Sequence, residues 1–125
     1  MDGDKPTGSF YTPEDIAGYI VENTIEGYLS CASKQSILDQ YSHVHDQPRL
    51  VGSLIDGIRI LDPAVGEGIF LLAAGEYLLQ LRQRYGDTRT TEEIKRHIVK
   101  NNLFGVDLLS LPIRKTRGLL LNWCN

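Results

Sequence analysis

Two acidic residues and a pair of glycines have the spacing of a nucleotide-like ligand site. The stretch Ile58–Leu72 reads as a short buried strand ending at Asp62, a tight loop with Gly66 and Gly68, and the start of an apolar helix. Glycine adopts positive φ angles and lets the backbone approach a ligand closely. The amides that open the next helix point toward that ligand. Because α/β proteins hold nucleotides with this order of strand, loop and helix, we expect the same chemistry here.

A further acid, Asp107, follows the apolar stretch Leu103–Leu108, which we predict to be a second buried strand. Two parallel strands that each end near an acid and lead into a helix form half of a nucleotide site. A carboxylate suits two ribose hydroxyl groups, because its two acceptor oxygens lie in one plane. Asp107 is therefore the candidate ribose ligand, although a simple strand-end turn or a helix-capping acid also fits this residue.

The loop differs from a dinucleotide or P-loop site. The dinucleotide fingerprint has a third glycine where this chain has Leu71, and its acid follows about 20 residues later. Here Asp107 lies beyond an additional helical segment. No lysine follows the loop to bind a phosphate group, which excludes a P-loop.

Metal-binding and redox residues give weaker signals. The cluster His43–Asp46 contains two histidines and an acid, but this composition is typical of a solvated loop, and we predict no metal site. Cys31 and Cys124 lie far apart and outside any Cys-x-x-Cys pair. We expect two reduced thiols, while a disulfide stays open.

The elements that position these groups are predicted from apolar spacing and capping residues. Thr12 and Pro13 suit a helix start, and taken alone they indicate only a helix cap. The first half of the chain then predicts a helix to about residue 29, a helical stretch at 33–41, a short apolar piece at 50–54 and a strand at 58–62 covered on both faces. The inner side of the first helix should carry Ile16, Ala17, Ile20, Val21, Ile25 and Tyr28.

The second half continues the alternation of helix and strand. It predicts an apolar helix that stops at Gly86, a helix capped by Thr90 or Thr91 that closes at 101–102, the strand at 103–108 and a last helix capped by Ser110. The solvated face of the helix after Thr91 should carry Lys95, Arg96, His97 and Lys100. The fold class is therefore α/β.

Composition limits the class of protein. The chain has 125 residues with 42% hydrophobic and 23% charged side chains, about one globular domain. We expect a flexible tail at residues 1–8 and a single domain over 9–125. A net charge of −3 argues against a strongly basic nucleic-acid groove built mainly by this segment. The polar start and the lack of a long apolar run predict a cytoplasmic protein without signal peptide or membrane span.

Three blocks of sequence together resemble the adenine-N6 DNA methyltransferases of restriction–modification systems. Gly8–Pro13 resembles their Gly-x-Tyr-Tyr-Thr-Pro block, and Asp62–Leu71 resembles their Asp-Pro-Ala-Cys-Gly-Ser-Gly-x-Phe-Leu loop. Asn101–Leu108 resembles their Asn-Asn-Leu-x-Gly-Val-Asp strand, and Ile113, Thr116 and Arg117 fit the helix after it. All three blocks in this order are fairly specific.

The resemblance implies an incomplete Rossmann-like, S-adenosylmethionine-dependent methyltransferase fold with an N-terminal helical segment. It implies S-adenosylmethionine as the cofactor. Tyr11 and Thr12 would then lie against its methionine part, while Asp107 would bind the ribose hydroxyls. Its amino and carboxylate groups would be held by Asp62 and by the backbone from Ala64 to Gly68.

The catalytic motif of this family, an Asp, Asn or Ser followed by Pro-Pro and an aromatic residue, is absent, because the five prolines include no Pro-Pro pair. We therefore assign no catalytic residue and expect the chain alone to be inactive. DNA would be bound through the remainder of a larger enzyme, and a partner chain or self-association would complete the open sheet edge. The alternatives are a non-catalytic interaction module or remnant, and a methyltransferase for protein or small-molecule amines.

Overall fold

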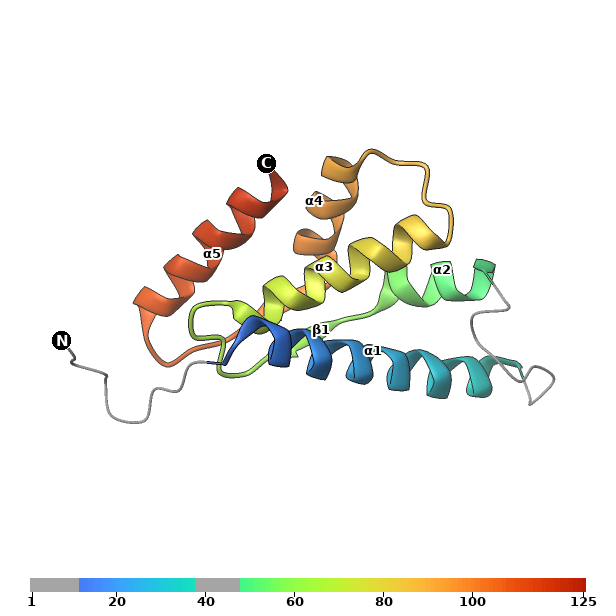
Figure 1. The fold of residues 1–125 in the computed structure, drawn as a ribbon, viewed down its shortest axis with the longest axis horizontal. Helices are drawn as coiled ribbons and strands as arrows, with labels where there is room; N and C mark the ends of the chain where they lie inside the picture. The colour runs from blue at the N-terminus through green and yellow to red at the C-terminus, as the bar shows by residue number, and fades with distance from the viewer. Residues whose placement is uncertain (1–11, 38–47) are drawn as a thin grey trace.

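The computed structural model describes residues 12–37 and 48–125, which form a mixed helical structure with a small parallel sheet. Figure 1 shows the arrangement of the elements. In chain order they are α1 (Glu14–Ile37), α2 (Pro48–Gly57), β1 (Ile60–Asp62), α3 (Ile69–Arg84), α4 (Thr91–Asn101), β2 (Leu103–Gly105) and α5 (Ser110–Cys124). The predicted α/β composition is therefore present. The expected tail at residues 1–8 and the cluster His43–Asp46 lie outside the described residues.

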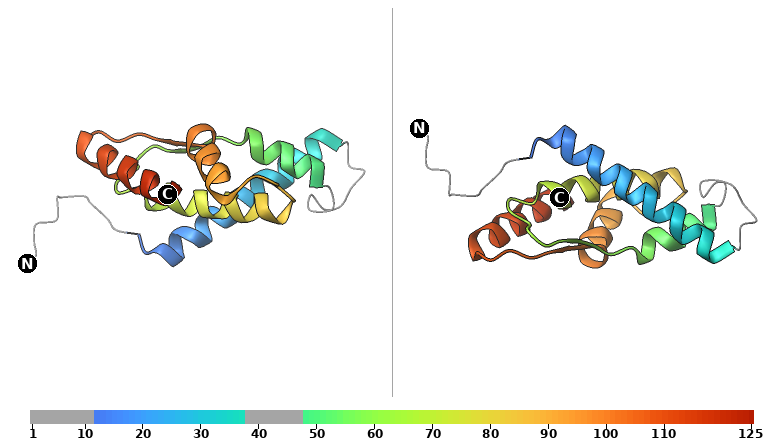
Figure 2. Two further views of the ribbon diagram at one scale, coloured as in Figure 1. Left: turned by 90° about the horizontal axis from the view of Figure 1, so that it is seen from above. Right: turned by 90° about the horizontal axis from the view of Figure 1, so that it is seen from below.

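Helix α3 lies at the centre, with α1 on one side and α4 on the other (Figure 1). It also contacts α2 and both strands. The two views of Figure 2 agree on this order and show α2 beside the C-terminal part of α1. A helix that is apolar on most of its circumference must be buried on several sides, as the sequence predicted. Its buried residues include Leu71, Ala74, Leu78, Leu79 and Leu81.

The first helix is longer than predicted, and its buried side is different. Helix α1 continues to Ile37, so the start of the stretch predicted as a second helix belongs to it. Its buried residues follow a strict spacing of four: Ala17, Val21, Ile25 and Leu29. Ile16, Ile20 and Tyr28, which we expected to face inward, are exposed. A stripe of one residue per turn is enough to cover α3, since α1 packs on it along one narrow face.

The apolar piece predicted at 50–54 is part of a helix. Helix α2 covers Pro48–Gly57 and buries Val51 and Ile55, one helical turn apart. The prediction missed it because a helix of ten residues, fewer than three turns, repeats the apolar spacing only a few times.

The two strands pair in parallel, with Ile60 opposite Leu103 and Leu61 opposite Phe104. Each is shorter than predicted. Ile60 and Leu103 pack on the helical core, whereas Leu61 is 60% exposed and Phe104 40% exposed. The prediction that the first strand is covered on both faces is therefore wrong for the described part of the chain. Successive side chains point to opposite faces, and the helices that contact the strands cover one of these faces.

Most helix ends agree with the sequence. Thr90 caps α4 in a capping box with Glu93, and Gly86 follows α3 at φ 84°. The cap of α5 was predicted wrongly: the helix begins at Ser110, and Leu109 occupies the cap position without a side-chain bond. Asp107 instead accepts a hydrogen bond from the Leu109 amide at 3.0 Å. An acid two residues before Leu109 thus satisfies the Leu109 amide at the start of α5, as in an Asx turn.

Two residues expected on the solvated face of α4 are partly buried. The Lys95 ammonium lies 4.9 Å from the centre of the Trp123 ring and donates to the Trp123 carbonyl. His97 lies 3.8 Å from an Asp56 oxygen, and burial together with Arg82 lowers its pKa. Arg96 and Lys100 are exposed as predicted. Periodicity alone missed this difference, because α5 and α2 cover parts of α4 that a single helix pattern does not reveal.

A buried polar network joins α2, α3, α4 and β1 at the end of the sheet. Asn102 is fully buried, and its Nδ2 lies within 3.3 Å of the carbonyl oxygens of Ile55, Asp56 and Ile58. Its Oδ1 accepts a hydrogen bond from the buried Arg82, which also pairs with Asp56. The network satisfies the backbone carbonyls that the end of α2 leaves open.

Replacing Asn102 tests this network. We expect Asn102→Ala to lower the free energy of unfolding by about 2–4 kcal/mol, because it removes the side-chain donor to buried carbonyls and one acceptor of the buried Arg82. The neighbouring Asn101 is exposed and its side chain bonds to its own helix at His97. Asn101→Ala should therefore cost about 0.5 kcal/mol or less. Urea unfolding followed by circular dichroism measures both, and equal losses would contradict this role of Asn102.

Two glycines should respond to alanine in opposite ways. A Cβ at Gly105 would lie 2.8 Å from Val65 Cγ2 and 3.1 Å from Leu71 Cδ1, under the glycine loop. Gly105→Ala should therefore destabilise the fold by about 1–3 kcal/mol. A Cβ at Gly118 in α5 would meet nothing within 4 Å, so Gly118→Ala should stabilise by about 0.5–1 kcal/mol. Thermal unfolding compares them, and the same sign for both would refute the packing argument.

Candidate functional site

The glycine loop connects Asp62 at the end of β1 to Ile69 at the start of α3. Gly66 has φ 52° and Gly68 has φ 89°, a region that side chains other than glycine rarely adopt. The Gly68 amide donates to the Val65 carbonyl at 2.9 Å, which closes a tight turn. The sequence therefore needs glycine at both positions for this shape.

The loop is joined to the end of the second strand by the backbone. The Val106 amide donates to the Asp62 carbonyl, and the Val65 amide donates to the Val106 carbonyl, both at 2.9 Å. These bonds continue the parallel pairing beyond the last residues of β1 and β2. They bring the two acids, Asp62 and Asp107, to the same edge of the sheet.

Asp107 binds the glycine loop itself. Its Oδ2 accepts from the Gly66 amide at 3.1 Å, and its Oδ1 accepts from Leu109. The amides of Leu109 and Gly66 lower the pKa of the Asp107 carboxyl, so it is ionised at neutral pH. A carboxylate has about four acceptor positions in all, so the group can accept a further donor besides these amides. Strand and helix patterns did not predict the bond to Gly66.

One of the two carboxylate oxygens of Asp62 lacks a hydrogen-bond donor within the described residues. Its Oδ1 accepts from the Ala64 amide at 3.0 Å, which shapes the start of the loop. Its Oδ2 is buried, and no hydrogen bond to it comes from the part of the chain that the structure describes. A buried acceptor without a donor costs free energy, so this oxygen suits a donor group of a ligand.

The start of α3 lies beside the loop, and within residues 12–37 and 48–125 nothing outside the helix accepts a hydrogen bond from its first amides. Gly68 occupies the cap position and supplies no side-chain bond, and the first turn holds no acid. The first amides of such a helix attract anionic groups. Glu67 is exposed and its carboxylate lies 3.8 Å from the Lys115 ammonium on α5, so a cation partly balances its charge.

The remaining predicted site residues lie around this edge or outside the description. Ala64 is exposed in the loop, and Thr12 is partly buried ahead of α1. Tyr11 lies outside the described residues, so its predicted position against a ligand stays a prediction. The structure thus brings together Asp62, Gly66, Gly68 and Asp107.

Thr116 contacts the loop, although from the sequence it was named only as a residue that fits the helix after the second strand. It is buried in α5, and its hydroxyl donates to the Gly66 carbonyl at 3.0 Å. The sequence does hold one indication of this contact. Thr116 lies one helical turn before the buried Leu120, so a polar residue falls on the side of α5 that faces the core.

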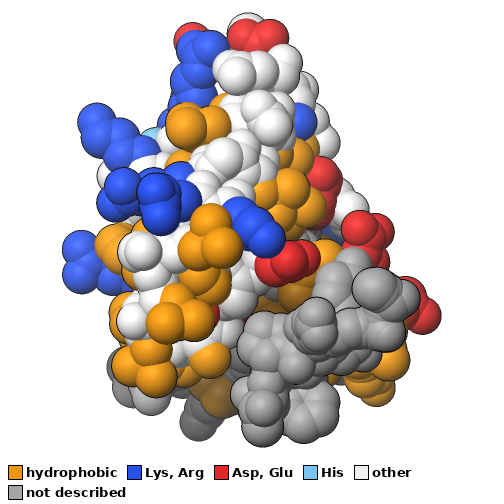
Figure 3. All heavy atoms as spheres, turned by 90° about the vertical axis from the view of Figure 1, so that its left-hand side faces the viewer, with side chains coloured by type: hydrophobic (Ala, Val, Ile, Leu, Met, Phe, Trp, Pro, Cys, Tyr) orange, Lys and Arg blue, Asp and Glu red, His pale blue; other side chains and the backbone are white. Residues whose placement is uncertain are grey.

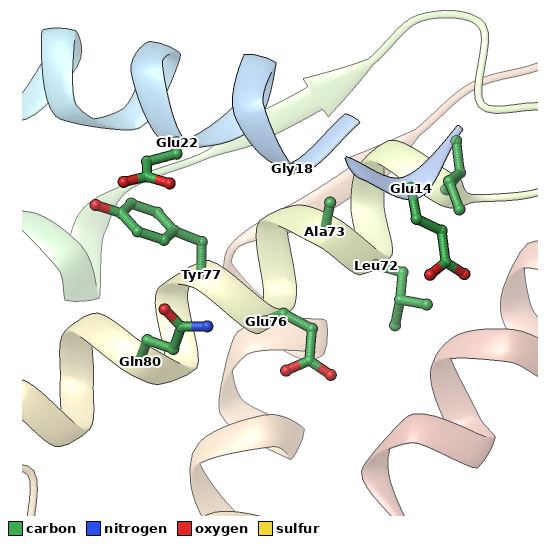
Figure 4. A pocket seen from close by; sticks show the side chains of 9 residues that line it. Glu14, Gly18, Glu22, Leu72, Ala73, Glu76, Tyr77 and Gln80 are labelled. Carbon is green, nitrogen blue, oxygen red and sulfur yellow. The ribbon is translucent and has the colours of Figure 1, made fainter. Parts of the chain in front are cut away.

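Two grooves flank α1. One of about 440 Å³ runs between α1 and the free edge of β1 and is mainly apolar, with Asp62 and Pro63 at one end. The other, about 340 Å³, lies between α1 and α3, where Glu14, Glu22 and Glu76 surround it (Figure 4). This acidic groove contains neither loop glycine nor Asp107, so we do not assign the predicted ligand to it.

Figure 3 looks at the end of the molecule where α5 begins, and hydrophobic side chains gather there below a group of Lys and Arg side chains. The exposed hydrophobic residues at this start are Leu108, Leu109 and Leu111.

Within residues 12–37 and 48–125, no group of three or more acids, histidines or cysteines suits a metal, and no helix is long and apolar enough to cross a membrane. Cys31 and Cys124 are free thiols.

Two curated relatives match the chain. It is 34% identical over 140 residues to a protein of Methanocaldococcus jannaschii that is provisionally named a type II restriction enzyme and methyltransferase. That match covers 92% of this chain and 12% of the relative. It is 32% identical over 117 residues to the adenine-specific methyltransferase PglX of Lacticaseibacillus casei, covering 78% of this chain and 10% of that protein.

The chain thus spans about a tenth of the length of these relatives. No family model matches it, and no solved structure matches it significantly. Both relatives are methyltransferases by name, one joined to a restriction enzyme and one specific for adenine. The resemblance seen in the three sequence blocks is confirmed: the chain belongs, as one segment, to the adenine methyltransferases of restriction–modification systems.

Proposed function

We propose that this chain is the S-adenosylmethionine-binding part of a DNA adenine-N6 methyltransferase of a restriction–modification system. One observation carries the proposal: a glycine loop and two acids meet at the carboxyl edge of a parallel strand pair, and within the described residues one buried oxygen of Asp62 has no hydrogen-bond donor. The relatives' names support the methyltransferase class. We further propose a Rossmann-like arrangement in one domain over residues 9–125.

The residues at this edge fit the three polar parts of the methyl donor. The α-amino group would donate to Asp62, whose free oxygen is an acceptor. The carboxylate would bind the amides of the loop and of the first turn of α3, which attract anions. The ribose hydroxyls would donate to Asp107, and Tyr11 and Thr12 would lie against the methionine chain. When bound, the cofactor supplies an activated methyl group.

The proposed role of this segment is to bind and orient the donor, and we assign it no catalytic residue. Its sequence contains no Pro-Pro-aromatic motif, which in the resembling family binds the adenine amino group. DNA would bind elsewhere in the longer enzyme, where the base is flipped out of the duplex. Methyl transfer to duplex DNA by this chain alone would contradict the proposal that this segment only binds and orients the donor. An enzyme acting on protein or small-molecule amines is the less favoured class, because one relative is adenine-specific by name.

Calorimetric titration tests the cofactor assignment. We expect saturable binding of S-adenosylmethionine and none of NAD. Asp62→Asn and Asp107→Asn should each weaken binding by about 10- to 100-fold, because each removes a charged acceptor. Glu92→Gln, an exposed change on α4, is the matched control and should have no effect. Clear NAD binding without any response to the methyl donor would contradict the proposal.

The pH dependence of this binding follows from Asp107. Its pKa lies below the usual range in the folded chain, so the carboxylate is protonated only as the pH falls through that lowered value. The contribution of Asp107 to affinity should therefore stay constant between about pH 6 and 8. A loss of affinity in that window that disappears in Asp107→Asn would show that the carboxylate titrates there.

A second candidate function is an interaction module that completes its sheet with another copy. The apolar groove beside the free edge of β1 favours it, because an added strand would lie there. Sedimentation equilibrium should then give a dimer. Ile20→Glu places a charge in the groove and should restore the monomer, whereas Tyr19→Glu, on the same helix outside the groove, should not. A monodisperse monomer of the unchanged chain would rule out self-association.

A further inference from the structure

Thr116 contacts both glycines of the loop. Its hydroxyl donates to the Gly66 carbonyl at 3.0 Å, and the residue is only 5% exposed. At Gly68 a Cβ would lie 2.9 Å from the Thr116 methyl carbon, so the threonine packs directly on the glycine backbone. Asp107 binds the amide side of Gly66 while Thr116 binds its carbonyl side.

Helix α5, which carries Thr116, is fixed independently of the loop. The Trp123 indole donates to Glu76 of α3 at 2.6 Å, and its ring packs where a Cβ at Gly75 would lie 3.0 Å away. Lys95 of α4 donates to the Trp123 carbonyl, and Leu120 is buried in the core. Contacts with α3 and α4 therefore hold α5 in place in addition to its contact with the loop.

The bonded carbonyl belongs to the peptide at the centre of the loop turn. The Gly68 amide closes that turn onto Val65, so the Gly66–Glu67 peptide is its middle unit. The common turn types of each hand differ mainly by a rotation of this middle peptide. In a trans peptide the carbonyl and the amide point in opposite directions. A carbonyl held toward α5 therefore directs the Glu67 amide away from α5, out of the loop.

We propose that Thr116 is a positioning residue: it selects the orientation of the Gly66–Glu67 peptide and so presents the Glu67 amide to the amino-acid part of the ligand. The inference rests on the proposed binding of S-adenosylmethionine. In the described part of the chain nothing accepts a hydrogen bond from this amide. Thr116 acts through the loop backbone and touches no reacting group.

Two substitutions distinguish the hydrogen bond of the Thr116 hydroxyl from the packing of its methyl group on Gly68. Thr116→Val keeps the shape and the methyl contact with Gly68 but removes the hydroxyl donor. Thr116→Ser keeps the donor and removes the methyl group. Thr91→Val is the control for the same change at an exposed helix start far from the loop. Trp123 is the sole tryptophan, so an unchanged fluorescence maximum in every variant verifies that α5 remains in place.

Binding should distinguish positioning from general damage. We expect Thr116→Val to weaken S-adenosylmethionine about three- to tenfold, the effect of one hydrogen bond, and Thr116→Ser to stay within about twofold. Binding of 5′-methylthioadenosine, which lacks the amino and carboxylate groups, should be unchanged in both. Equal losses for the two ligands, or an unchanged affinity in Thr116→Val, would overturn the proposal.

The amide itself gives a readout that needs no ligand. In ¹H–¹⁵N spectra, the Glu67 resonance should shift in Thr116→Val and stay near its original position in Thr116→Ser. If the unchanged chain does not bind the methyl donor, the proposed function fails, and this spectrum alone decides whether Thr116 orients the peptide. An identical Glu67 resonance in all three proteins would exclude that role.

Discussion

The structure depends on one constraint, the burial of a helix that is apolar on nearly every side. Helix α3 cannot satisfy this requirement against a single neighbour, so α1, α2, α4 and the strand pair gather around it. The same helix begins at the glycine loop. Its tight seating therefore fixes the end of the loop at Gly68, while Leu71 packs under the strand ends beside Gly105. Core packing and the candidate ligand site are therefore parts of one arrangement.

Polar contacts divide into two groups at opposite ends of the strand pair. At the entry to β1, Asn102 and Arg82 satisfy the carbonyls left by α2 and hold the helices in register. At the carboxyl edge, Asp107 and Thr116 hold the two sides of Gly66. The first group is closed on itself and suits a structural role. In the second group, acceptors and amides lack partners within the described part of the chain, which is why the function is sought there.

The sequence allowed the central part of the fold to be predicted well. Gly66, Gly68 and Gly86 marked the turns, and the pair Thr90 and Thr91 marked a helix start, because each of these residues acts through its own local backbone. The C-terminal end of α1, the helix α2 and the partial burial of Lys95 were missed, because tertiary neighbours decide them. The strand that contains Leu61 was predicted to be covered on both faces. The apolar sequence of a strand does not show which of its faces has a neighbour.

The candidate site was predicted in part for similar reasons. The loop and both acids stand out by residue type and order. The bond from the Gly66 amide to Asp107 and the hydroxyl contact of Thr116 join residues far apart in the chain, and no local pattern encodes them. The proposed ligand comes from the resemblance to methyltransferases, because residue spacing alone indicates only a nucleotide-like molecule.

The shortness of the sheet has a consequence for cooperativity. With three residues in each strand, the ladder itself contributes few hydrogen bonds, and the bonds of Val65, Val106 and Asp107 to the loop edge add several more. Opening the loop therefore loosens the strand pair, and separating the strands releases the loop. Ligand occupancy and sheet integrity are linked equilibria, so any molecule that binds the loop also stabilises the sheet that forms it.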